Sequence, residues 1–429
     1  MDSFTYREGR LFVENVPVAE IARAVGTPAY IYSKATFVDH LAKIQQAYTD
    51  IDTTVCFSIK ACGNINILRF MAEQGSGFDV VSGGELFRAQ EAGADMTKTV
   101  YAGVGKTDEE IVQALNAGIG YFNIESEAEL ENIIRICRKA GKKARAALRV
   151  NPDVDPKTHT YITTGKKESK FGVDIERAKR VFDTYGGNGV VNLCAVHIHL
   201  GSGGQTIDPY VEALEKIMTL VDDLAAGGHT IEAIDMGGGY GADYTTGYGP
   251  SALDYAGGII PLLRGRGLKL ILEPGKSIAA NAGILLTRVL YRKTGGSKRF
   301  VIVDAGMNDL IRPPLYGAFH FIWPASVENG HAPLLKREKM ELEGLETVDI
   351  VGPICEGSDF FAQDRDIPPV ERGDHLAIFT AGAYGFTMSS NYNARPMAPE
   401  VLVDGDRFSV IRRRQRYEDL VQLEKPYVR

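Results

Sequence analysis

The sequence lacks the features that mark membrane, secreted and nucleic-acid-binding proteins. No apolar run approaches the roughly 18 residues that a membrane-spanning helix needs. The N-terminal segment has no apolar core of the signal-peptide kind. Acidic residues outnumber basic ones by 55 to 48, and the net charge of −7 leaves no basic excess for nucleic acid or an anionic membrane surface.

Cysteine is scarce, and low-complexity tracts and polar linkers are absent. The five cysteines are odd in number and scattered, without any paired metal-ligand spacing. We therefore expect free thiols and a reducing, cytoplasmic location. A length of 429 residues, 44% of them hydrophobic, predicts two or three globular domains, or one large barrel with a second unit.

The middle of the chain repeats one unit, in which a short apolar run is followed by a helical stretch of about 10 to 20 residues. Amphipathic stretches such as 127–141 and 209–228 lie between the runs, and several end at glycine. Eight units predict an α/β fold with a (β/α)8 TIM barrel. An open doubly wound sheet would show the same alternation of strands and helices. The count of eight favours the barrel. The apolar runs are 55–61, 77–82, 99–105, 121–126, 144–151, 193–202, 233–240 and 269–275.

A change of pattern after Pro274 predicts a second, β-rich domain. We expect the strand-like N-terminal segments 10–18 and 28–33, which precede a helix at 33–50, to join it. The predicted domains are a barrel at 34–276 and a discontinuous β-rich domain formed by 1–33 and 277–429. Its strand-like, turn-separated segments are 299–306, 348–355, 375–385, 399–405 and 407–413.

Two further segments are expected to be irregular. The charged stretch 325–345 has weak patterning and predicts an exposed loop or helix. The stretch 152–172 is long for a connection inside a barrel and is a candidate lid.

Lys60 lies in VCFSIKACGN, at the end of the first apolar run. It either reaches water beyond the strand or serves as a neutral, nucleophilic amine of the Schiff-base type. Active sites of TIM barrels lie at the carboxyl ends of the strands, and other unusual residues share this position, which favours the second interpretation. These residues are Asp79, Glu85, Arg149, His197, His199, Gly237, Gly238, Gly239 and Glu273.

Each of these groups also has a purely structural interpretation. The triple glycine 237–239 forms either a tight turn or a phosphate cradle. His197 and His199 face the same way on a strand, but the metal interpretation is weaker because no further histidines lie at strand ends. His199 alone suffices to lie flat against an aromatic cofactor, with Ser202 nearby for a phosphate, and His197 is then a satisfied core histidine.

Glu273 either pairs with Lys60 or Arg149 or sits against the nitrogen of a pyridine ring. A carboxylate there keeps the nitrogen protonated, which makes the ring a strong electron sink. Together these residues indicate pyridoxal 5′-phosphate. The lysine would form an imine, the glycines would bind the phosphate, the histidine would lie flat on the ring, and the glutamate would contact the ring nitrogen.

The sequence resembles the fold-type III pyridoxal-phosphate-dependent decarboxylases, and among them the diaminopimelate decarboxylases, over nearly its whole length. The resemblance implies a barrel plus a β-rich domain, a homodimer with active sites shared across the interface, and decarboxylation of meso-2,6-diaminopimelate to L-lysine and carbon dioxide. The motifs that carry it are FSIKACGN, GFDVVSGGEL, HTYITTGKKESKFGV, VHIHLGSGG, DMGGGYG, EPGK, DAGMNDLIRPPLYGAFH, GPICEGSDFFAQDR and AGAYGFTMSSNYNARP.

The same resemblance implies roles for single residues. Lys60 is similar to the imine lysine, His199 to the residue stacked on the ring, and Glu273 to the partner of the ring nitrogen. Cys355 is similar to the acid that protonates the product, and both it and its neighbour Glu356 would reach into the partner subunit's site. The remaining implied ligands are Ser202, Gly239 and Tyr384 for the phosphate, with Arg312, Tyr316, Glu356, Tyr384 and Lys276 for the substrate; no metal is expected.

The sequence departs from the family pattern at Lys276, where relatives usually carry the arginine of EPGR. Lysine offers a point charge in place of a planar fork. A related decarboxylase of ornithine, lysine, arginine or carboxynorspermidine is therefore the first alternative. The others are an alanine-racemase-like enzyme and a cofactor carrier or inactive homologue, against which the Cys355-Glu356 pair and a complete second domain argue.

Overall fold

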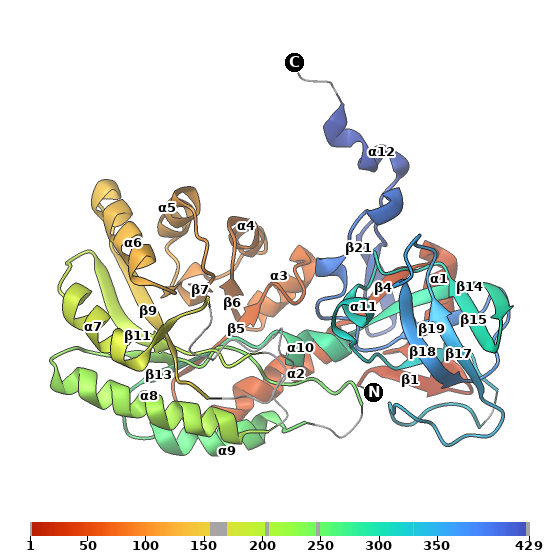
Figure 1. The fold of residues 1–429 in the computed structure, drawn as a ribbon, viewed down its shortest axis with the longest axis horizontal. Helices are drawn as coiled ribbons and strands as arrows, with labels where there is room; N and C mark the ends of the chain where they lie inside the picture. Colours follow the sequence, from red (N-terminus) through yellow and green to blue (C-terminus); the bar gives the residue numbers. More distant parts are fainter. Residues whose placement is uncertain (1, 155–169, 202–205, 246–248, 329, 426–429) are drawn as a thin grey trace. The chain divides into compact units, whose positions relative to one another are not determined.

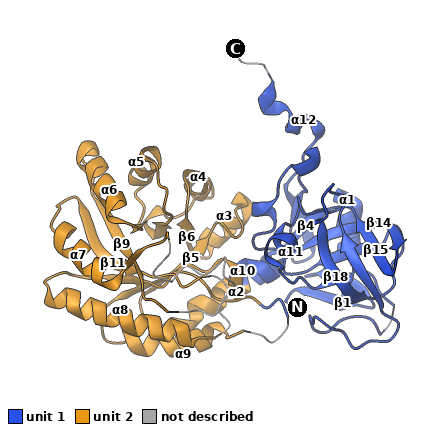
Figure 2. Ribbon diagram, viewed as in Figure 1, with its two compact units in different colours: residues 1–38, 243–248, 278–429 blue, residues 39–242, 249–277 orange. Residues whose placement is uncertain are grey.

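A computed structural model describes residues 2–154, 170–201, 206–245, 249–328 and 330–425. The chain divides into two compact units (Figure 2). One comprises residues 1–38, 243–248 and 278–429, and the other comprises residues 39–242 and 249–277. The segment 243–248, which lies inside the sequence range predicted for the barrel domain, groups with the first unit. The predicted domain boundaries stay a prediction.

The second unit is a closed barrel of eight parallel strands, as predicted. The strands pair in the order β9-β11-β12-β13-β5-β6-β7-β8, and β8 pairs with β9 to close the sheet. A short further strand, β10 (Val173–Asp174), also pairs with β9. The barrel strands are β5 (Thr53–Ser58), β6 (Gly77–Val80), β7 (Thr99–Tyr101), β8 (Tyr121–Ile124), β9 (Ala144–Asn151), β11 (Val191–His197), β12 (Ala233–Asp235) and β13 (Lys269–Leu272).

Helices alternate with these strands and lie outside them (Figure 1). Local signals set their ends: α5 starts with a capping box between Thr107 and Glu110 and ends at the left-handed Gly118. The helices are α2 (Lys34–Ala47), α3 (Ile65–Glu73), α4 (Gly83–Glu91), α5 (Asp108–Ala117), α6 (Glu127–Ala140), α7 (Ile175–Tyr185), α8 (Asp208–Ala226), α9 (Ala252–Leu263) and the short α10 (Lys276–Ala279).

Most barrel strands end earlier than the apolar runs predict. The run 193–202 is a strand only to His197, and the run 233–240 only to Asp235. Glycine and polar residues at the ends of the runs take loop conformations, because parallel pairing stops where the chain leaves the barrel. Several of the predicted site residues consequently lie in the first residues after a strand.

The first unit is rich in β-strands, as predicted. A three-stranded sheet has the order β1-β2-β3, and a larger sheet has the path β18-β17-β15-β14-β4-β20-β21, with β19 paired to β14 and β16. The N-terminal strand β4 lies between β14 and β20. The strands are β1 (Phe4–Arg7), β2 (Arg10–Val13), β3 (Val16–Pro17), β4 (Ala29–Ser33), β14 (Gly283–Gly295), β15 (Lys298–Val303), β16 (Ile322–Pro324), β17 (Glu346–Val351), β18 (Phe360–Ile367), β19 (His375–Ile378), β20 (Glu400–Asp404) and β21 (Arg407–Arg412). Its helices are α1 (Val18–Val25), α11 (Arg312–Tyr316) and α12 (Tyr417–Leu420).

The sequence patterns missed five of the described strands, namely β1, β10, β14, β16 and β18. β14 changes partners along its length, from β4 and β19 to β15, so its burial has no single period of two. β1 and β18 carry mixed polar and apolar residues without a clear alternation, and β10 and β16 are too short to show a pattern.

The stretch 325–345 contains no helix in its described part, and the expectation that it is exposed is wrong at Lys336. Lys336 is 3% exposed and donates to Asn281 Oδ1 at 2.9 Å and to Thr380 Oγ1 at 3.0 Å. Leu334, two residues earlier, is 89% exposed. Among the described helices, none is long and apolar enough to cross a membrane.

Candidate active site

Lys60 lies in a turn directly after β5, at the carboxyl end of the barrel. Its Nζ donates to Oδ2 of Asp79, on β6, at 2.5 Å, and the Ser58 hydroxyl donates to the same oxygen at 2.7 Å. The Asp79 side chain is fully buried, whereas the Lys60 side chain is 34% exposed. Burial and the nearby Glu273 raise the pKa of Asp79, and Lys60 opposes that rise. The amine is thus held by a buried carboxylate and remains accessible to a ligand.

Glu85 lies in the first turn of α4, which Ser82 caps. Its Oε2 accepts a hydrogen bond from the Val81 backbone N–H at 2.8 Å. Burial and the charge of Asp79 raise the pKa of Glu85 to about 7. Two carboxyl groups with raised pKa values therefore lie beside Lys60.

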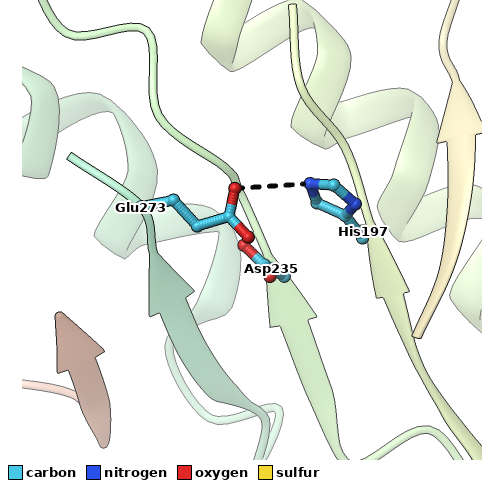
Figure 3. Close-up of side chains that lie close together, drawn as sticks. All are labelled: His197, Asp235 and Glu273. Atoms are coloured by element: carbon cyan, nitrogen blue, oxygen red, sulfur yellow. Dashed lines mark ion pairs between the residues drawn. The ribbon is translucent and has the colours of Figure 1, made fainter. Parts of the chain in front are cut away.

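Glu273 follows β13 and points toward His197 and Asp235 (Figure 3). Its nearest ion-pair contact is His197 Nε2 at 3.7 Å. Burial alone would raise the pKa of Glu273, but the neighbouring His197 and Lys60 hold it below its usual range. Lys60 instead pairs with Asp79, and Arg149 pairs with Glu125. The alternative prediction, in which Glu273 forms an ion pair with Lys60 or Arg149, is therefore wrong.

Asn123, on β8, joins the two carboxyl groups of this cluster. Its Nδ2 donates to Asp235 Oδ2 and to Glu273 Oε1, both at 2.9 Å. Burial and the charge of Glu273 raise the pKa of Asp235 well above its usual range. Asp235 therefore binds a proton more tightly than Glu273 does, which favours the ionised form of Glu273.

His197, Asp235 and Glu273 offer one ligand atom each within 4.8 Å of one another, which is a spacing that a metal ion could use. The amide of Asn123 and the backbone N–H of Gly237, which donates to Asp235 Oδ1 at 2.9 Å, already stabilise the two carboxyl groups. The cluster favours a hydrogen-bonded network over a metal centre. His197 is not a satisfied core histidine, because neither ring nitrogen has a hydrogen-bond partner among the described residues.

His199 lies two residues beyond β11 and is a neutral imidazole. Burial and the charge of Arg149 lower the pKa of His199 well below its usual range. The backbone N–H of Gly238 donates to its Nδ1 at 3.1 Å, so the remaining proton resides on Nε2. A neutral ring held at one nitrogen suits stacking on a flat cofactor.

The triple glycine 237–239 is required by close packing. A Cβ at Gly238 would lie 2.4 Å from the carbonyl oxygen of Glu273, and one at Gly239 would lie 2.4 Å from that of Gly201. Gly239 also has a φ of +105°, which favours glycine. Close packing is the observed reason for these glycines, whereas β12 ends at Asp235 and α9 begins at Ala252, so they do not form a tight strand-to-helix turn. The phosphate role stays a prediction, and Ser202 and most of the lid candidate 152–172 lie outside the described residues.

Arg149, on β9, forms a buried ion pair with Glu125, with Nη1 and Oε1 3.0 Å apart. Its Cζ also lies 4.5 Å from the ring centroid of Phe171. Its Nε and Nη2 are buried without a hydrogen-bond partner among the described residues. Such donors are costly to bury unless a ligand or water accepts from them.

The predicted substrate residues of the first unit lie in two groups. Arg312 begins α11, is 8% exposed, and lies with its Cζ 5.9 Å from the ring centroids of both Tyr316 and Tyr384. Tyr384 has a φ of 56°, an uncommon backbone conformation for a residue other than glycine. Lys276, in the barrel unit, begins α10.

Cys355 and Glu356 form the second group and are exposed. The Cys355 backbone N–H donates to Asn393 Oδ1 at 2.8 Å, and the Tyr392 hydroxyl donates to Glu356 Oε1. Asp359 stabilises this turn by accepting from the backbone N–H groups of residues 307 and 354, both at 2.6 Å. The turn therefore presents a thiol and a carboxylate at the surface of its unit.

Sequence reasoning missed three members of the barrel site: Asn123, Glu125 and Asp235. Each lies at the carboxyl end of a barrel strand, in a position that the strand pattern marked. Their residue types have no motif of their own, so only the position signals them. They hold Glu273 and Arg149, which the sequence did indicate.

The residues of the barrel site fit pyridoxal 5′-phosphate. Lys60 supplies an accessible amine and Glu273 an ionised carboxylate, and both lie at the carboxyl end of the barrel. Buried nitrogen atoms of Arg149 and His197 lack partners among the described residues, as expected where a polar ligand completes a site.

Comparison with known proteins agrees with this fit. The family described as "Pyridoxal-dependent decarboxylase, pyridoxal binding domain" matches residues 34–280. The chain is 45% identical to the diaminopimelate decarboxylase of Aquifex aeolicus over 418 residues, which cover 97% of this chain and 96% of that one. The diaminopimelate decarboxylase of Helicobacter pylori, solved with L-lysine, has a TM-score of 0.89 and 39% identity and covers 96% of this chain and 100% of its own. The M. jannaschii enzyme, also with L-lysine, has a TM-score of 0.91 and 37% identity, with coverages of 100% and 98%.

The closed barrel, the lysine at its carboxyl end and this family match together define a pyridoxal-dependent decarboxylase. Within that class, the chain belongs to the diaminopimelate decarboxylase family.

Proposed function

We propose that the protein decarboxylates meso-2,6-diaminopimelate to L-lysine and carbon dioxide, using pyridoxal 5′-phosphate. The observation that carries the proposal is the pairing of Lys60 with buried Asp79 beside an ionised Glu273. Lys60 would hold the cofactor aldehyde, His199 would lie against the ring, and Glu273 would lie beside the ring nitrogen. When bound, the cofactor supplies an electron sink for the bond that breaks as carbon dioxide leaves.

The chain's own residues prepare this chemistry. Asn123 keeps Glu273 in place, and His197 and Lys60 keep it ionised, so that a negative charge would face the ring nitrogen. Asp79 holds the Lys60 amine, and neutral His199 adds no competing cation at the ring face. Cys355 would then deliver a proton to the α-carbon of the product.

The preference for a second carboxylate is argued from Arg312. Its side chain is almost fully buried, and no carboxylate lies within ion-pair distance of it in the described part of the chain. A buried guanidinium without an anion is costly unless a ligand supplies one. The distal carboxylate of diaminopimelate would be that anion, bound by the planar guanidinium fork.

The protein is also proposed to be a cytoplasmic homodimer with shared active sites. All five cysteines are free, which supports a reducing compartment. The exposed turn at Cys355 and Glu356 supports the shared site, because reactive groups at a surface are explained if they complete the site of a partner subunit.

The test is release of carbon dioxide by purified protein with added cofactor. We would offer meso-, LL- and DD-diaminopimelate, D- and L-lysine, ornithine and arginine. Strong turnover of the meso isomer alone is the expected result. Preference for an amino acid without the distal carboxylate would overturn the substrate assignment, and Lys276→Arg would then be the first variant to make.

A further inference from the structure

Tyr244 belongs to the short segment between β12 and α9 that groups with the first unit. Its hydroxyl oxygen is buried and has no hydrogen-bond partner among the described residues. Burial raises the pKa of Tyr244, and Arg312 opposes that rise without reversing it. The group is therefore a protonated hydroxyl that lacks an acceptor.

Tyr244 lies against Arg312. The Cζ of Arg312 is 5.5 Å from the Tyr244 ring centroid, and Arg312 Nε is also buried without a partner in the described part of the chain. Two hydrogen-bond donors, one of them a cation, thus lie together without an acceptor. This arrangement is complementary to a carboxylate, which accepts only.

His320 supports Tyr244 from a second direction. Their rings meet edge to face, with centroids 5.4 Å apart and planes at 85°. The Nδ1–H of His320 donates to the Phe379 carbonyl at 2.9 Å, and burial together with Arg312 lowers the pKa of His320 to about 3. His320 is accordingly neutral and adds no second positive charge beside Arg312, and as an imidazole it cannot supply the anion that would pair with Arg312.

We infer that Tyr244 is a substrate-binding residue that donates its hydroxyl hydrogen bond to the distal carboxylate held by Arg312, and thereby determines specificity for amino acids that carry one. The inference rests on the proposed function for the role of Arg312. It adds an uncharged second donor, which shares with Arg312 the discrimination in favour of a distal carboxylate.

The experiment compares L-lysine with cadaverine, which differ only in that carboxylate, as ligands of the cofactor-loaded enzyme in a calorimeter. Tyr244→Phe keeps the ring and removes the hydroxyl. We expect L-lysine to bind about 10- to 100-fold more weakly and cadaverine within about twofold of wild type, as for loss of one charge-assisted hydrogen bond. The KM for meso-diaminopimelate should rise by a similar factor, with kcat changed less than about threefold.

Tyr291→Phe is the matched control, because Tyr291 is in the same unit and is 56% exposed. It should leave both ligands and both kinetic constants unchanged. Unchanged binding of L-lysine by Tyr244→Phe, with an unchanged KM, would overturn the inference.

Arg312→Met separates this result from failure of the proposed function. If wild type prefers L-lysine to cadaverine, and Arg312→Met removes the preference while Tyr244→Phe does not, only the role of Tyr244 fails. If wild type shows no preference and no turnover of meso-diaminopimelate, the proposed function fails and the inference with it.

Discussion

The Nζ of Lys60 and the Oδ2 of Asp79 lie 2.5 Å apart, and Asp79 is the buried member of the pair. A carboxylate at this distance stabilises the charged amine in the cofactor-free protein. The pair therefore favours the protonated amine over the neutral amine that reacts with an aldehyde.

Asp79→Asn should shift the pH range in which Lys60 reacts with an aldehyde. With the opposing charge removed, the pH for half-maximal attachment of the cofactor should fall by about one unit. The measurement is the growth of cofactor absorbance in cofactor-free protein across a pH series. Asp52→Asn, at an exposed carboxylate before the start of β5, is the control and should not shift the curve.

Glu273→Gln should keep the shape of the site and remove its ionised carboxylate. We expect the rate of carbon dioxide release per bound cofactor to fall by about 100- to 1,000-fold, the usual effect of losing one well-placed electrostatic group. Single-turnover assays normalised to cofactor content measure this. Glu232→Gln, whose carboxylate pairs with Arg145 outside the site, should retain activity. A loss explained wholly by lower cofactor content would contradict the assignment.

Glu85→Gln should change how the stability of the cofactor-free protein depends on pH. Because the pKa of Glu85 is about 7 in the folded chain and lower in the unfolded chain, the folded state binds the proton more tightly between pH 5 and 7. Stability at this site is therefore lost as pH rises through that window. The free energy of unfolding of Glu85→Gln relative to wild type should increase by roughly 1–3 kcal/mol from pH 5 to pH 8. Glu91→Gln, exposed on the same helix, should show no such trend.

Mixing two inactive variants tests the shared site. Cys355→Ala should retain cofactor absorbance and lose normal turnover, whereas Lys60→Ala should lose both. Equal mixtures, dissociated and reassociated, should recover about a quarter of the wild-type rate, since half of the random dimers carry one intact site of two. Mixtures that stay inactive would show that Cys355 and Lys60 of one subunit serve the same site.

The sequence predicted the barrel more completely than the β-rich unit. Eight repeated apolar runs predicted a closed barrel because each strand and helix is a local unit with its own period. The strand β14 escaped because its partners change along its length and come from distant parts of the sequence. In the site, Lys60 and Glu273 were recognisable as charged groups at strand ends. Asn123 was not, because only its contacts with Asp235 and Glu273 reveal its role.

The position of β4 also bears on how the chain folds during synthesis. Tyr32, on β4, donates a side-chain hydrogen bond at 2.9 Å to Glu400, which lies 368 positions later. At about 5 to 20 residues per second, the ribosome needs about 20 to 70 s to make the intervening chain. All eight barrel strands are synthesised in that interval. Until β14 and then β20 have been synthesised, β4 lacks the two strands with which it pairs. The β-rich unit thus completes its sheet last, and its N-terminal strand is the part of the nascent chain that a chaperone would need to shield.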